Sequence, residues 1–100
     1  MPGSQDYAPD PRNENALLYL NGEMVPRSEA KVSVFDAGFG MGDGVWEGVR
    51  LHKGKFLFLD AHLDRLFAGA KAIMLDIGSR ADIVAALKKT FDTNKMETGV

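Results

Sequence analysis

The segment from Phe35 to Arg65, FDAGFGMGDGVWEGVRLHKGKFLFLDAHLDR, decides the fold of this chain. It begins with a run in which every second residue from 38 to 44 is glycine. Alternating apolar residues then predict a strand over Gly44–Leu51, because successive side chains of a strand point to opposite faces. His52–Lys55 predicts a turn, and the apolar run Phe56–Leu59 predicts a returning strand. The segment therefore predicts a hairpin that leads into a helix.

Two helices are predicted after this hairpin. Asp60 is a suitable N-cap for the first, and one apolar stripe at helical spacing runs along it. The stripe consists of Leu59, Leu63, Leu66, Phe67, Ala70, Ile73 and Met74. Ser79 followed by Asp82 resembles a capping box, so the second helix is expected to begin there and to continue to about Asn94.

A second hairpin is predicted before the glycine run. Asn21-Gly22 lies between two apolar runs and is typical of a type I′ turn, in which both central residues have positive φ. Pro26 is expected to end the second strand. Ser28–Ala30 predicts a turn or a single helical turn, and the alternating Lys31–Asp36 predicts a further short strand.

These elements predict an α+β domain: a small, mostly antiparallel sheet with two helices on one side. Residues 1–15 hold three of the four prolines and predict a flexible N-terminal arm. The domain itself is expected to span residues 16–100. Because Thr98–Val100 resembles a loop that leads into another strand, we expect the domain to be cut before its last strands.

Composition excludes several classes of function. The chain is 45% hydrophobic and 26% charged, which is near the globular average, and its net charge is −2. No basic block is present, so no nucleic-acid or membrane partner is expected, and no apolar run approaches the roughly 20 residues that span a bilayer. The absence of cysteine fits a reducing compartment, and a cytoplasmic protein is expected. Neither histidine has a partner at metal-ligand spacing, so no metal site is expected.

One candidate site lies on the predicted strand. Trp46, Gly48 and Arg50 share one face, where an apolar wall, a gap and a planar guanidinium outline a site for an amino or oxo acid. The alternative is a core tryptophan beside an arginine at the rim of the sheet. The pattern alone favours that alternative.

A second candidate lies on the first helix. His62 and Arg65 are three residues apart and are neighbours on the helix surface, where they could hold a phosphate. The alternative is an exposed arginine beside a half-buried histidine, and the periodicity favours it because Arg65 lies far from the apolar stripe. Glu47 is expected to make a structural hydrogen bond. Asp43 lies too far along the strand to form an acid–base pair with it.

Three motifs in this order resemble a known family: Asn21-Gly22, then FGMGDGVWEGVR at Phe39–Arg50, then HLDRL at His62–Leu66. Together they look like the N-terminal part of the class IV (fold-type IV) pyridoxal-phosphate enzymes. That family includes branched-chain aminotransferases, D-amino-acid aminotransferases and aminodeoxychorismate lyases. The resemblance extends from about Leu17 to about Ile77, and the ordered combination is far more specific than any single motif.

The resemblance implies roles for four residues. Arg65 matches the arginine that binds the phosphate of pyridoxal 5'-phosphate, and Trp46 matches an aromatic residue that lines the substrate pocket. Arg50 matches an arginine that lies near the substrate carboxylate in the branched-chain group, which favours an L-amino acid. The family forms dimers with residues of the neighbour near the active site, and the segment around Met41 is a candidate contributor.

The resemblance also implies what this chain lacks. The family's Schiff-base lysine lies in a second, C-terminal domain, so we expect it downstream of residue 100 and expect the 100-residue chain alone to be inactive. The intact protein is expected to be a homodimeric aminotransferase that moves an amino group between a branched-chain-like amino acid and a 2-oxo acid. Two alternatives remain: an aminodeoxychorismate lyase-like enzyme, and a non-catalytic dimerisation or binding module of the same fold.

Overall fold

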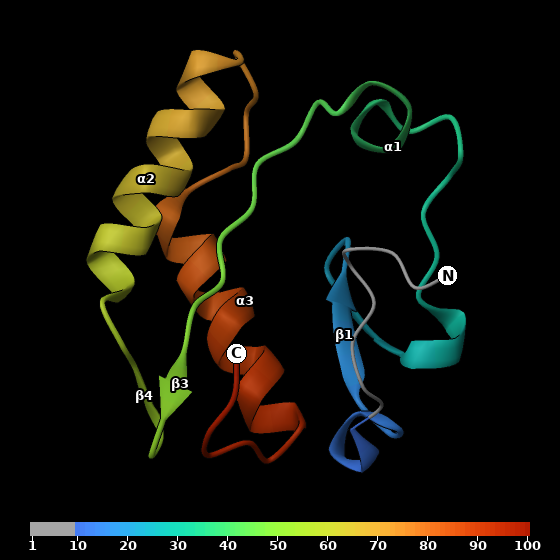
Figure 1. The fold of residues 1–100 in the computed structure, drawn as a ribbon, viewed down its shortest axis with the longest axis vertical. Coiled ribbons are helices and arrows are strands. Elements are labelled where there is room, and N and C mark those ends of the chain that lie inside the picture. Colours follow the sequence, from blue (N-terminus) through green and yellow to red (C-terminus); the bar gives the residue numbers. More distant parts are fainter. Residues whose placement is uncertain (1–9) are drawn as a thin grey trace, which may run out of the picture.

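The structure is a computed structural model that describes residues 10–100. Short antiparallel strands and helices make up the chain, which confirms the α+β class (Figure 1). In chain order the elements are the 3-10 helix η1 Pro11–Asn13, β1 Leu17–Leu20, β2 Glu23–Pro26, the 3-10 helix η2 Arg27–Glu29, α1 Ala37–Met41, β3 Leu51–His52, β4 Lys55–Phe56, α2 Leu59–Ala72 and α3 Arg80–Thr93.

The first hairpin, β1–β2, is formed as predicted. Its strands pair antiparallel, with Leu17 opposite Pro26. Asn21 and Gly22 have φ angles of 50° and 89°, and these two positive values are those of a type I′ turn. The strand ends at Pro26, and η2 follows at once, where a single helical turn was expected.

The second hairpin is shorter than predicted. Only Leu51–His52 and Lys55–Phe56 pair, because the chain leaves the hairpin at Phe58, which has φ 54°, and enters α2 at Leu59. The return strand predicted over Phe56–Leu59 is therefore wrong beyond Phe56, and no strand within residues 10–100 lies against the extended segment 43–50. The predicted alternation is nevertheless present, since Val45, Glu47 and Val49 are half-buried whereas the residues between them are exposed. The strand prediction for Gly44–Leu51 was therefore correct about the faces and wrong about the pairing.

The end of the chain returns to this hairpin. The Leu51 N–H donates to the Gly99 carbonyl at 2.8 Å, and the Gly99 N–H donates back to the Leu51 carbonyl at 2.9 Å. The Gly54 N–H also donates to the Glu97 carbonyl at 2.9 Å. Residues 97–99 thus run antiparallel beside β3.

The glycine run forms a helix that was not predicted. The Asp36 carboxylate accepts a hydrogen bond from the Gly38 N–H at 2.8 Å and caps α1, which ends at Gly42 with φ 73°. The short strand predicted for Lys31–Asp36 does not form, because the Asp36 N–H donates to the Ser33 carbonyl at 3.1 Å and closes a turn at residues 34–35. Figure 1 shows α1 standing apart from α2 and α3.

The N-cap of α2 lies two residues earlier in the sequence than predicted. Its N-cap is Phe58, which has φ 54° and makes no side-chain capping bond, so the prediction of Asp60 as N-cap was wrong. The tight exit from β4 places the left-handed residue at Phe58, and Asp60 falls in the first helical turn. A carboxylate there still interacts favourably with the helix dipole.

The apolar stripe of α2 holds the core. Leu63 and Ala70 are each 2% exposed, as is Leu51 of β3. The predicted stripe extends past the end of the helix, because Ile73 and Met74 follow Ala72 and are exposed.

Helix α3 begins and ends as predicted. Ser79 Oγ accepts from the Asp82 N–H at 3.1 Å, and Asn94 is the C-cap. The Arg80 guanidinium donates to Asp64 Oδ1 at 2.8 Å and to Asp60 Oδ1 at 3.2 Å, which links the start of α3 to the start of α2.

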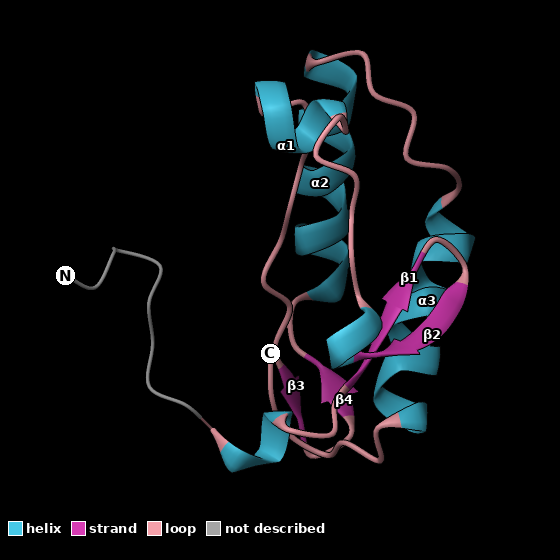
Figure 2. Ribbon diagram, turned by 90° about the vertical axis from the view of Figure 1, so that its right-hand side faces the viewer, coloured by secondary structure: helices cyan, strands magenta, loops and turns pink. Residues whose placement is uncertain are grey.

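The strands form two separate two-stranded sheets rather than one (Figure 2). Helix α3 lies between them: the Phe91 ring packs edge-on to Phe56 of β4, with centroids 5.4 Å apart, and the Asn94 side chain bonds to the backbone of Leu17 in β1.

The predicted N-terminal arm lies mostly outside the described residues. Within it, Pro11–Asn13 forms η1, which the Asp10 side chain caps. No helix in the described part of the chain is long and apolar enough to cross a membrane.

Candidate functional site

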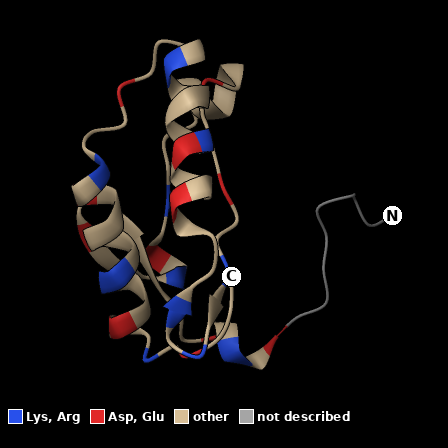
Figure 3. Ribbon diagram, turned by 90° about the vertical axis from the view of Figure 1, so that its left-hand side faces the viewer, with Lys and Arg blue, Asp and Glu red and all other residues tan. Residues whose placement is uncertain are grey.

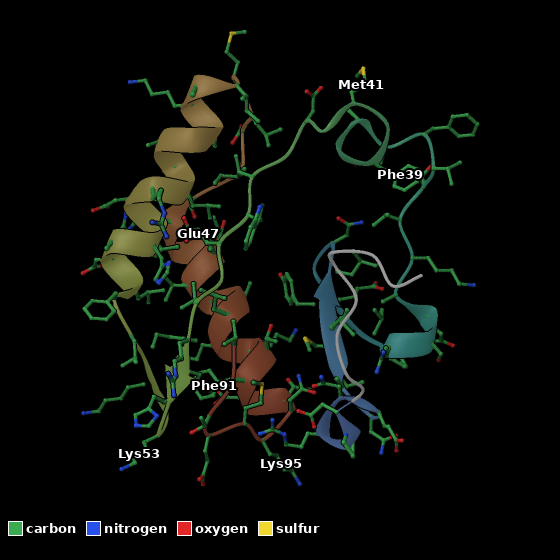
Figure 4. All side chains as sticks on the ribbon, in the orientation of Figure 1. Phe39, Met41, Glu47, Lys53, Phe91 and Lys95 are labelled. Atoms are coloured by element: carbon green, nitrogen blue, oxygen red, sulfur yellow. The ribbon has the colours of Figure 1, made fainter. Side chains whose placement is uncertain are left out.

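A carboxylate on the extended segment meets two side chains of α2. Glu47 alternates with Val45 and Val49 on the half-buried face of the segment, so its side chain lies toward the helix (Figure 4). Its Oε2 lies 2.7 Å from His62 Nδ1 and 2.7 Å from Arg65 Nη2, and its Oε1 accepts from Arg65 Nε. The arginine and the carboxylate therefore form a bidentate ion pair.

The environment of this pair makes Glu47 strongly acidic. The Glu47 side chain is 11% exposed and that of His62 is 20% exposed, whereas that of Arg65 is 70% exposed. Hydrogen bonds, first from Arg65 and then from His62, lower the pKa of the Glu47 carboxyl to about 2. The bond to Glu47 raises the pKa of Arg65. At neutral pH both partners are therefore charged.

The ion pair lies in the wall of a groove between the extended segment and α2. Seven residues line this groove: Val45, Trp46, Glu47, Gly48, Arg65, Leu66 and Gly69. Gly69 of α2 faces the extended segment, since a Cβ at this position would lie 3.4 Å from Val45 Cγ1, in van der Waals contact. Most of the lining is apolar, and the Arg65 guanidinium supplies its positive charge.

The groove brings together two of the four predicted site residues. Arg65 lines it, and so does Trp46, which is 86% exposed. The core position that the pattern alone favoured for Trp46 is therefore wrong. Arg50 is exposed on the same face as Trp46 but does not line the groove. Met41 is 75% exposed at the end of α1 and lies well away from Glu47 (Figure 4).

The sequence indicated a hydrogen bond for Glu47 but not its partners. A signal was present: an acid alternates with valines on the inward face, and His62 and Arg65 lie on adjacent turns of a helix that was expected to pack nearby. The exposed arginine and half-buried histidine expected from the helical periodicity are both observed. The structure adds that one carboxylate joins them.

Comparison with known proteins finds aminotransferases that are similar to this chain. No family model matches the chain. It is 46% identical over 89 residues to the branched-chain-amino-acid aminotransferase-like protein 1 of Arabidopsis thaliana, an alignment that covers 88% of this chain and 16% of that protein. It is 40% identical over 84 residues to a D-alanine aminotransferase of Staphylococcus aureus, covering 83% of this chain and 30% of that protein.

A solved structure agrees with these relatives. The branched-chain aminotransferase of Thermoproteus uzoniensis, solved with norvaline, superposes with a TM-score of 0.71 at 31% identity and covers 82% of this chain and 29% of that one. Over this stretch the chain is similar in sequence and in fold to branched-chain and D-alanine aminotransferases. It spans less than a third of the length of each of these three proteins.

The aminotransferases to which the chain is similar imply pyridoxal 5'-phosphate, and the groove contains one side chain, Arg65, whose chemistry suits the phosphate of such a cofactor. A phosphate needs a donor with fixed direction and positive charge. Arg65 is held through Nε and Nη2, whereas its Nη1 makes no hydrogen bond within residues 10–100. The side chain thus keeps donors for an anion while its position is already determined.

The charges around the groove are mixed in sign. Acidic and basic side chains are mixed along α2 (Figure 3). Among residues 10–100, no group of three or more His, Asp or Glu side chains is arranged to hold a metal ion.

Proposed function

We propose that the full-length protein is a pyridoxal 5'-phosphate-dependent aminotransferase, which moves an amino group between an amino acid and a 2-oxo acid. The names of the relatives support this activity. The observation that carries the proposal is the Arg65 guanidinium, which Glu47 holds in the groove wall while its Nη1 makes no hydrogen bond to the described residues.

In this proposal Arg65 binds the phosphate of the cofactor. When bound, pyridoxal phosphate supplies an electron sink for the Cα of the amino acid. The enzyme also needs a lysine that holds the cofactor and moves a proton. All seven lysines of this chain are exposed and none lines the groove: Lys31, Lys53, Lys55, Lys71, Lys88, Lys89 and Lys95. We therefore propose that the catalytic lysine lies beyond residue 100.

Trp46 and Arg50 are proposed to bind the amino-acid substrate. Trp46 gives the groove an aromatic wall, and its 86% exposure leaves the ring available to a ligand. Arg50 lies on the same face of the segment, four residues further along, and is proposed to bind the substrate carboxylate. A branched-chain-like L-amino acid is the proposed donor, and Met41 is proposed to contribute from the glycine-rich segment.

A cytoplasmic homodimer completes the proposal. The family resemblance supports the dimer, as do the exposed apolar side chains of Phe35, Phe39 and Met41 around α1. The absence of cysteine supports the reducing compartment. Sedimentation of the full-length protein tests the dimer, and a monomer at micromolar concentration would contradict it.

The test of cofactor binding uses the full-length protein. Titration with pyridoxal phosphate should change its visible absorbance, and borohydride should fix the cofactor covalently on one lysine. Arg65→Ala is expected to weaken cofactor binding about 10- to 100-fold, which is the loss expected for a hydrogen bond between charged groups. Arg80→Ala is the matched control, because Arg80 pairs with Asp64 outside the groove. Equal cofactor affinity in Arg65→Ala and the wild type would refute the assignment.

The test of the substrate side compares amino donors. Transamination of a 2-oxo acid is measured with L-leucine and with D-alanine. Arg50→Met should raise KM for the amino acid and leave cofactor affinity unchanged. An unchanged KM would remove the carboxylate role from Arg50.

A further inference from the structure

Glu47 is a charged residue on the half-buried, otherwise apolar face of the extended segment. The neighbours on that face, Val45 and Val49, are apolar, and Leu51 at the end of it is fully buried. A carboxylate in such surroundings loses hydration and is retained only where charged or hydrogen-bonding partners compensate. Glu47 has two such partners, His62 and Arg65, and both come from α2.

Both partners contact the same carboxylate oxygen, Oε2. His62 Nδ1 lies 2.7 Å from Oε2, and the histidine side chain is only 20% exposed, so it is itself held by packing. Arg65 uses both Nε and Nη2 on the same carboxylate. The half-buried pair of Glu47 and His62 thus supports the side chain of the exposed Arg65.

An exposed arginine without such a partner samples many rotamers, so an anion that binds to it must pay for the loss of side-chain entropy. The bidentate bond to Glu47 orders the side chain before any ligand arrives. It also leaves Nη1 without a partner among the described residues, so the arginine can bind an anion without breaking the ion pair.

We propose that Glu47 is a positioning residue for the cofactor phosphate, acting by holding the Arg65 guanidinium in the groove wall. This inference rests on the proposed function, in which Arg65 binds that phosphate. The negative charge of Glu47 opposes phosphate binding, but the orientation effect is larger because both oxygens of the carboxylate are already engaged by Arg65 and His62.

The test compares two ligands that differ only in the phosphate. Dissociation constants for pyridoxal 5'-phosphate and for pyridoxal are measured on the full-length apoprotein, wild type and Glu47→Gln. The variant should bind pyridoxal phosphate about tenfold more weakly, as expected for one charge-assisted hydrogen bond. It should bind pyridoxal as the wild type does. Equal loss for both ligands, or unchanged or tighter binding of pyridoxal phosphate, overturns the inference, since a merely structural role affects both ligands alike.

Two further measurements separate this inference from the proposed function. In an Arg65→Ala background, Glu47→Gln should have no additional effect on the phosphate preference. If the wild type prefers pyridoxal phosphate and Arg65→Ala removes that preference while Glu47→Gln leaves it intact, only the role of Glu47 is refuted. If the wild type shows no preference for the phosphorylated ligand, both proposals fail.

A spectroscopic measurement covers the case in which the variant does not fold. In the wild-type apoprotein the Arg65 Nε–H should give a nuclear magnetic resonance signal that exchanges slowly with water, because the carboxylate holds that hydrogen. The Nε–H of the exposed Arg12, which bonds to Asp10, serves as the reference for a surface pair. An Arg65 signal that exchanges as fast as that of Arg12 would show that the guanidinium is not held, and would overturn the inference without any variant.

Discussion

Asn94 is the side chain whose removal should most clearly separate the first hairpin from the helices. Its Oδ1 accepts from the Leu17 N–H at 2.8 Å, and its Nδ2 donates to the Leu17 carbonyl at 2.9 Å across 77 residues of sequence. The same Nδ2 donates to the Thr90 carbonyl at 2.8 Å. The amide thus takes the place of a neighbouring strand for Leu17 and binds β1 to the end of α3.

The expected effect of Asn94→Ala follows from these bonds. Each contributes about 1 kcal/mol net, so the loss of the two bonds to Leu17 should destabilise the docked hairpin by about 2 kcal/mol. In native-state hydrogen exchange the Leu17 amide, which Asn94 protects, should then exchange about 30-fold faster, since about 1.4 kcal/mol corresponds to a factor of ten. Asn94→Asp keeps the acceptor and loses the donor, so the exchange rate of its Leu17 amide should lie between those of the wild type and Asn94→Ala.

The control for this experiment is Asn15→Ala. Asn15 is exposed and makes no side-chain hydrogen bond among the described residues, so its replacement should change stability by less than about 0.5 kcal/mol. If the Leu17 amide exchanges at the wild-type rate in Asn94→Ala, the side chain does not hold the hairpin and the reasoning is wrong.

Three further predictions follow from packing, charge and backbone conformation. Leu63→Ala should cost about 3 kcal/mol in urea unfolding, because Leu63 is 2% exposed, whereas Leu18→Ala at an exposed site should cost far less. The Glu47 pKa is lowered from 4.5 to about 2, so its ion pair stabilises the fold fully above pH 4.5 and is lost as the pH falls toward 2; a carboxyl carbon titration midpoint near 4.5 would contradict this. Gly22→Ala should destabilise by about 1 kcal/mol in thermal unfolding because Gly22 has φ 89°, whereas Gly40→Ala, inside α1 and with open space around the added Cβ, should stabilise by up to about 1 kcal/mol.

Local features of the chain were predictable because the interacting groups are close in sequence. The turn at Asn21-Gly22 depends on the φ angles of two adjacent residues, and the start of α3 depends on a bond from Ser79 to a backbone N–H three residues later. The helix stripe likewise follows from a period of 3.6 residues. The missed α1 shows the limit of this approach, since glycines at every second position disfavour a helix that the Asp36 cap nevertheless starts.

The sequence indicated individual residues of the site but not the contacts between them. The motifs indicated Trp46 and Arg65 through a family resemblance, while periodicity alone favoured a core tryptophan and a solvated arginine. The pairing of Glu47 with Arg65 joins residues 18 apart on different elements, and no local rule specifies that contact.

The amino-acid sequence by itself determined the α+β class, the type I′ hairpin, the two amphipathic helices and the family motifs, because each of these depends on neighbours within a few residues. Only the tertiary structure decided that the inward carboxylate of the extended segment meets α2, that Trp46 stays exposed, and that two small sheets flank α3. Those outcomes depend on which distant surfaces pack together, and a carboxylate placed among valines is tolerated only once that packing brings an arginine and a histidine to it.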